Sequence, residues 1–177
     1  MKTNWVKHLF DVKILLLVSL ICCGCNRSTP APVAPVAPIE EACTLQTVLE
    51  PGIPGSPGHL IASDLNVNGA SELATLMRAM KSDLESARAS MERGEPVAPM
   101  YARHRKIRCA WPTGLEDRNP RFDASAITYL QRVRTLDSRP ADLPAAYEGV
   151  VAGCLACHAN SCPGPISAIE KLRLLPR

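Results

Sequence analysis

Five consecutive residues near the C-terminus, Cys154-Leu155-Ala156-Cys157-His158, constrain this chain more than any other feature. The two cysteines are three residues apart, so on an α-helix their side chains lie on one side of a single turn. Asp142 and Pro144, upstream, are typical of the start of a helix. We therefore expect a helix that begins near Asp142 and runs through His158, with only 19 residues after it.

This spacing is the signature of covalent c-type haem attachment. Each thiol forms a thioether to one vinyl-derived carbon of the porphyrin, and the histidine places its imidazole under the iron. The sequence thus predicts one covalent haem c, held by Cys154 and Cys157, with His158 as the proximal iron ligand. Two other uses of such cysteines are disfavoured. A thioredoxin-like motif needs a βαβ context, and a zinc site needs a second, closely spaced ligand pair.

The N-terminus has the form of an export signal. Three lysines, at positions 2, 7 and 13, precede a short apolar run from Ile14 to Ile21. This run is well below the ~20 residues needed to span a bilayer. The cysteines that follow resemble the end of a bacterial lipoprotein signal peptide, although Cys22 stands where such signals usually have Leu. We expect residues 1–24 to be the signal peptide and Cys25 to be lipidated, with Cys23 as the alternative.

An exported, lipid-anchored domain would lie on the periplasmic side of a bacterial membrane, and Asn26 after the lipidated cysteine favours the outer membrane. The content of eight cysteines is high for a reduced cytosolic protein and agrees with an oxidising compartment. The formal net charge of +3 is small and no RNA-binding aromatic motif is present, which argues against a nucleic-acid partner.

Prolines divide the exported chain into two parts. Seven of the 16 prolines lie between Asn26 and Pro57, and the run Pro30–Pro38 is typical of extended polyproline II structure. Residues 25–66 are therefore predicted to be a Pro-rich tether. Residues 67–177 are predicted to be the folded haem domain.

The folded part has the periodicity of helices. Between positions 71 and 93 the apolar residues lie on one helical face: Leu73, Leu76, Met77, Met80, Leu84, Ala87 and Met91. Further helices are expected over 99–110, over 124–137 with Asp123 as N-cap, and over 166–172. In the 124–137 helix the expected inward residues are Ile127, Leu130, Val133 and Leu136. No strand-like alternation is present, which predicts an all-α antiparallel four-helix bundle.

A haem motif at the end of the last of four helices resembles the class II, cytochrome c-prime-like family. The resemblance extends to residues 72–94 and 147–158, and it ends after His158, where Cys162-Pro163 must break the helix. In this family the far side of the iron faces the first helix. The resemblance implies Met77 or Met80 as the distal ligand, Arg78 as a haem-propionate partner, and a possible homodimer.

Other residues remain as alternatives. His59 and His104 are the remaining histidines of the exported chain, and His104 is expected to be a solvated side chain in a basic run. Cys43, Cys109 and Cys162 are left over, and two of them should pair in an oxidising compartment. We expect Cys109 with Cys162. Pairings of Cys43 with either one are the alternatives.

The function expected from these features is electron transfer between redox partner proteins by a lipid-anchored mono-haem cytochrome. The alternative is a five-coordinate haem protein that binds nitric oxide or carbon monoxide. An enzyme such as a peroxidase is not expected, because no acid/base pair is evident for the open side of the iron. A thiol-redox or zinc-stabilised module is the non-haem alternative.

Overall fold

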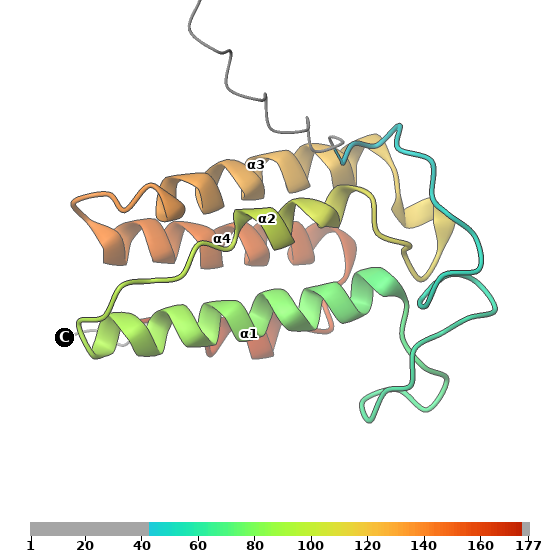
Figure 1. Cartoon of the computed structure of the whole chain (residues 1–177), viewed down its shortest axis with the longest axis horizontal. Helices are drawn as coiled ribbons and strands as arrows, with labels where there is room; N and C mark the ends of the chain where they lie inside the picture. The colour runs from blue at the N-terminus through green and yellow to red at the C-terminus, as the bar shows by residue number, and fades with distance from the viewer. Residues whose placement is uncertain (1–42, 175–177) are drawn as a thin grey trace, which may run out of the picture. The chain divides into compact units, whose positions relative to one another are not determined.

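The computed structural model describes residues 43–174, and this part of the chain is all-α, as the sequence predicts. Figure 1 shows the order of its helices. They are α1 (Glu72–Glu92), α2 (Tyr101–His104), α3 (Pro120–Asp137), α4 (Leu143–Ser161) and α5 (Ile166–Glu170), with 3₁₀ turns η1 (Arg105–Arg108) and η2 (Leu115–Asp117). The β pairing within residues 43–174 is a single bridge between Ile61 and Ala70.

The first helix, α1, confirms the prediction for residues 71–93. Its N-cap is Ser71, whose hydroxyl accepts a hydrogen bond from the Ala74 N–H. It ends just before Gly94, which has φ +69°, a backbone conformation that glycine adopts at little cost. Its buried side chains are Met80, Leu84 and Ala87, all on the predicted apolar face.

The predicted second helix, over 99–110, is only one α-helical turn, α2, followed by the 3₁₀ turn η1. Asp137, at the end of α3, accepts hydrogen bonds from the backbone N–H groups of Met100 and Tyr101. These bonds satisfy two donors at the start of α2 and hold it against α3. Met100 and Ile107 are buried, so this short segment still contributes to the core.

The third helix begins one turn earlier than predicted. Asn119 is its N-cap, since its side-chain oxygen accepts from the Phe122 N–H, and Pro120 occupies the first turn. Asp123 is therefore not the cap, and its carboxylate binds Arg108 instead. The prediction that Ile127 points inward is also wrong, because 39% of this residue is exposed. Ala126, beside it, is fully buried and occupies the inward position.

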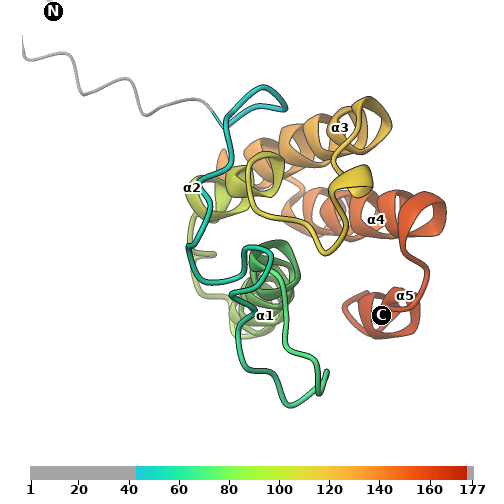
Figure 2. The ribbon, with the colours of Figure 1, turned by 90° about the vertical axis from the view of Figure 1, so that its right-hand side faces the viewer.

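The last long helix, α4, lies along α3, as both Figure 1 and Figure 2 show. Its N-cap is Asp142, as predicted, and it ends at Ser161, where the Cys162-Pro163 pair stops it. Gly153 permits the close approach to α3, since a Cβ there would meet side-chain atoms of Arg132 and Tyr129 at 3.2 and 3.3 Å. The helix that carries the Cys154–His158 motif is thus held firmly against its neighbour.

The buried Tyr147 joins α4 to two other parts of the fold. Its hydroxyl lies 2.8 Å from the carbonyl oxygen of Leu172 and 3.2 Å from that of Leu84. Leu172 follows α5 and Leu84 is in α1. The Tyr147 side chain therefore connects α1, α4 and the C-terminal segment.

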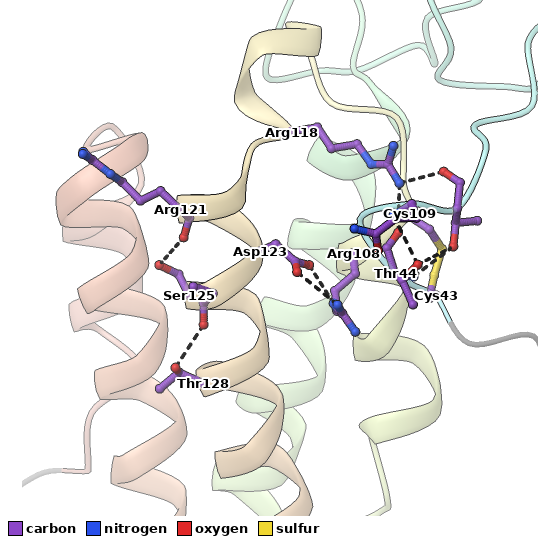
Figure 3. Close-up of polar contacts among 12 residues, drawn as sticks. Cys43, Thr44, Arg108, Cys109, Arg118, Arg121, Asp123, Ser125 and Thr128 are labelled. Atoms are coloured by element: carbon purple, nitrogen blue, oxygen red, sulfur yellow. Dashed lines mark hydrogen bonds and ion pairs between the residues drawn. A yellow bond between two sulfur atoms is a disulfide. The ribbon is translucent and has the colours of Figure 1, made fainter.

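Residues 43–66, which fall within the predicted tether of 25–66, form part of one compact unit with the helices. The Arg118 guanidinium donates to the backbone carbonyls of Thr44 and Thr47, and the Trp111 indole N–H donates to the carbonyl of Glu50 (Figure 3 shows the first of these). Residues near the start of the described chain are therefore hydrogen-bonded to the part that the sequence predicts to be the domain.

The disulfide is Cys43–Cys109, with the two Cα atoms 5.3 Å apart (Figure 3). The expected Cys109–Cys162 pairing is wrong, and one of the alternatives is found. Cys109 follows η1 and faces the segment that begins at residue 43. Cys162 is an exposed free thiol at the end of α4.

Breaking this disulfide should destabilise the domain. It links residues 66 apart in the sequence, so its loss restores a large loop-closure entropy to the unfolded chain. We expect the double variant Cys43→Ser/Cys109→Ser to lose about 2–4 kcal/mol of unfolding free energy, measured by chemical denaturation. Cys162→Ser is the matched control and should unfold like the wild type. Equal stability of the double variant and the wild type would contradict the pairing.

The predicted signal peptide of residues 1–24, the lipidation at Cys25 and the Pro30–Pro38 run lie outside the described residues. Among the helices of residues 43–174, none is long and apolar enough to cross a membrane.

Candidate haem-attachment site

The motif residues lie on the last two turns of α4. Cys154, Cys157 and His158 are each partly buried, and both thiols are free. They line a small cavity of about 20 Å³ to which three other elements contribute. The other lining residues are Met77 and Met80 from α1, Ile107 from η1, Ala126 and Tyr129 from α3, and Gly153 from α4. The structure thus brings the predicted proximal and distal residues together.

The orientation of His158 fits an iron ligand. Its Nδ1 lies 2.8 Å from the backbone carbonyl oxygen of Cys162. A carbonyl oxygen can only accept, so Nδ1 carries the ring proton and Nε2 keeps its lone pair for a metal. Metal-bound histidines usually donate their other N–H in this way, which fixes the ring and raises its basicity. The broken helix end at Cys162 therefore has a role at the site.

The two thiols have the opposite character from those of a thiol-redox motif. Burial raises the pKa of Cys154 to about 12, although a hydrogen bond with Tyr129 works against this. Burial also raises the pKa of Cys157, with a smaller opposing effect from Ser125. Reactive cysteines of thioredoxin-like sites have lowered pKa values because the thiolate is the nucleophile. Both thiols stay protonated at neutral pH, which disfavours the thiol-redox alternative.

The lining of the cavity is suited to the face of a porphyrin. Apart from the Tyr129 hydroxyl and the motif itself, its side chains are thioether or hydrocarbon. The cavity itself is too small for a macrocycle, but it lies at the seam between α1 and α4. Helix α4 packs mainly on α3 and α5, whereas α1 packs mainly on α2 and η1. The donor set and the apolar lining fit haem c.

Of the other residues predicted for the site, some line the cavity and others do not. Met80 is buried and Met77 is partly buried, and both reach the cavity. Arg78 is half-buried outside the lining and forms no hydrogen bond or ion pair with another described residue. His59 is exposed and does not line the cavity.

His104 is not the solvated side chain that its basic neighbours suggested. It is fully buried, with Nδ1 2.8 Å from the Tyr129 hydroxyl and Nε2 3.1 Å from Asp83 Oδ2. The signal that reveals its position is the spacing from Met100 to His104 to Ile107, which places all three on one helical face. Of the neighbouring arginines, Arg103 is exposed and binds the same Asp83 carboxylate, whereas Arg105 is partly buried.

Within residues 43–174, no three or more His, Cys, Asp or Glu side chains are grouped to hold a metal ion between them. No protein-family profile, no curated protein and no solved structure matches the chain.

Proposed function

We propose that the chain is a mono-haem c-type cytochrome that carries electrons. The observation that supports this most directly is the His158–Cys162 hydrogen bond, which leaves Nε2 free beside two thiols at the required spacing. Cys154 and Cys157 would form the thioethers and His158 the proximal iron bond. When bound, the haem supplies reversible one-electron chemistry.

The fold that we propose for the haem-bound protein is a cytochrome c-prime-like antiparallel four-helix bundle. The order of the elements supports it, because α1, the α2–η1 segment, α3 and α4 follow one another with the motif on the last helix. The second helix of this bundle, the α2–η1 segment, is shorter than the resemblance implies. Because the segment is too short to be held by extensive helix packing, it is held by the hydrogen bonds to Asp137 and by the Cys43–Cys109 disulfide.

The chain's own residues would tune the site in three ways. Met77 or Met80 of α1 would supply a thioether sulfur as a second protein ligand to the iron. The apolar lining lowers the local dielectric and excludes water, which influences the reduction potential. Arg78, with no ion pair among the described residues, is free to bind a carboxylate of the haem edge.

The N-terminus would place this domain at a membrane. We propose that residues 1–24 direct export, that Cys25 carries lipid, and that residues 26–42 tether the domain on the periplasmic side of a bacterial outer membrane. Redox proteins would be its partners. A homodimer stays a prediction.

The second candidate function is binding of nitric oxide or carbon monoxide to a five-coordinate iron. The apolar character of the residues opposite α4 favours it, since Ile107 and Ala126 cannot ligate a metal and the methionines can also act as core residues. The two functions differ in whether a methionine holds the sixth position.

Methionine variants distinguish them. We expect the reduced wild type to be low-spin and inert to carbon monoxide, and either Met77→Ala or Met80→Ala to become high-spin and bind the gas. Met91→Ala, on the same helix but outside the cavity, is the control and should behave as the wild type. A wild type that binds carbon monoxide, with no spectral change in either variant, would favour the gas-binding function. Absorption spectra with and without the gas are sufficient.

A further inference from the structure

A chain of hydrogen bonds joins the haem-attachment cavity to a second pocket. The second pocket, of about 80 Å³, lies between α1 and the segment before α2, and Asp83 lines it. His104 bridges Asp83 and Tyr129, and Tyr129 lines the haem-attachment cavity. The Asp83 side chain is 24% exposed whereas His104 is fully buried. The chain therefore leads from a solvent-accessible carboxylate to the site.

The partners define where the protons lie. Burial lowers the pKa of His104, although the hydrogen bond and the charge of Asp83 act against this, so the ring is neutral at neutral pH. Burial also raises the pKa of Tyr129 well above its usual value, so its phenol keeps its proton. An ionised Asp83 can only accept, which places the ring proton on Nε2. Nδ1 then accepts from the Tyr129 hydroxyl.

A second proton on the ring would reverse one of these bonds. Nδ1–H becomes a donor, and the Tyr129 oxygen must accept from it. The Tyr129 hydroxyl hydrogen then needs another acceptor. The sulfur of Cys154 also lies within hydrogen-bonding reach of this hydroxyl. Protonation of His104 therefore turns the Tyr129 O–H from His104 toward the haem-attachment cavity.

We propose that His104, with Asp83 and Tyr129, is a proton-binding site coupled to the redox state of the haem-attachment site. This inference rests on the proposed cytochrome function. When the site gains one electron from a donor protein, His104 takes up one proton from solvent through the Asp83 pocket. When the electron leaves, the proton leaves. The charge at the site and the charge on the ring then compensate each other, and the Tyr129 hydroxyl transmits the change.

Burial and charges of both signs act on the pKa of His104, and their net effect is to lower it. Asp83 on α1 and Asp137 on α3 favour the protonated ring, while burial and Arg103 on α2 oppose it. Tyr129 on α3 and, beyond it, Cys154 on α4 complete the surroundings. Added negative charge at the site raises the pKa of His104, so the reduced form binds the proton more tightly.

The test is the midpoint potential of the haem-loaded protein between about pH 5 and pH 8, the range of a histidine. We expect the wild-type potential to fall as pH rises, by up to about 59 mV for each tenfold change in proton concentration. His104→Gln, which cannot ionise, should give a flat profile. Tyr129→Phe, which keeps the ring and removes the hydroxyl, should lose most of the slope. His59→Gln, at the exposed histidine, is the control and should keep the wild-type slope.

The outcomes separate this inference from the proposed function. A protein without covalent haem refutes the proposed function. A haem-loaded wild type with a flat profile, or a His104→Gln variant with the wild-type slope, overturns this inference alone. If circular dichroism shows that His104→Gln does not fold, the Tyr129→Phe profile decides, and an unchanged slope there overturns the coupling.

Discussion

Replacement of Cys154 and Cys157 together by alanine is expected to abolish covalent haem retention. No thioether can form without the sulfurs, and the remaining His158 would hold haem by one coordinate bond only. The helix should persist, because alanine is the strongest helix former and both cysteines are only partly buried. The variant is produced in a bacterium that attaches haem c to exported proteins. Haem that stays with the protein after acid–acetone extraction is then measured, and it should fall to background.

Cys162→Ala is the matched control for this experiment. Cys162 is a free, exposed thiol only five residues beyond Cys157, so it shares the chemistry and the neighbourhood but not the spacing. It should retain as much haem as the wild type. Haem retention by the double variant, or its loss in the control, would contradict the assignment of the two attachment cysteines.

Replacement of His158 by alanine should leave the haem attached but remove its proximal nitrogen. The structure gives this ring a fixed tautomer and leaves Nε2 free, so no other described side chain of the motif can supply the same bond. We expect the spectrum of the variant to change completely in the visible region. Imidazole added to the solution should restore the wild-type spectrum, because it supplies the missing donor to the space left by the side chain.

His59→Ala provides the comparison, since His59 is exposed and does not line the cavity. Its spectrum should equal that of the wild type, with or without imidazole. A His158→Ala spectrum identical to the wild type would show that another residue holds the iron.

Much of the fold was predictable because it depends on local signals. The helix with Met77 and Met80 has a long apolar period and a strong cap, and Asp142 with Pro144 marks the start of the motif helix. Where two start signals compete, the sequence alone misleads. Asn119-Pro120 begins α3 one turn before the equally plausible Asp123, because Arg108 from another element occupies the Asp123 carboxylate.

The parts that the sequence did not reveal depend on distant contacts. Cys109 pairs with Cys43 because Arg118 and Trp111 draw residues 44–50 onto the domain, and nothing local indicates this. His104 looks solvated beside its arginines until Asp83 and Tyr129 are seen on its other sides. At the candidate site, the motif itself was evident, whereas the choice between Met77 and Met80 depends on a helix seam that both residues reach.

The central claim, covalent haem at Cys154 and Cys157, is tested most directly on the wild-type protein itself. The protein is purified after export from a bacterium that matures c-type cytochromes, extracted with acid–acetone, and its absorption spectrum is recorded before and after reduction. The account predicts one haem per chain that stays with the protein and shows the reduced spectrum of a c-type cytochrome. A colourless protein after extraction would contradict it.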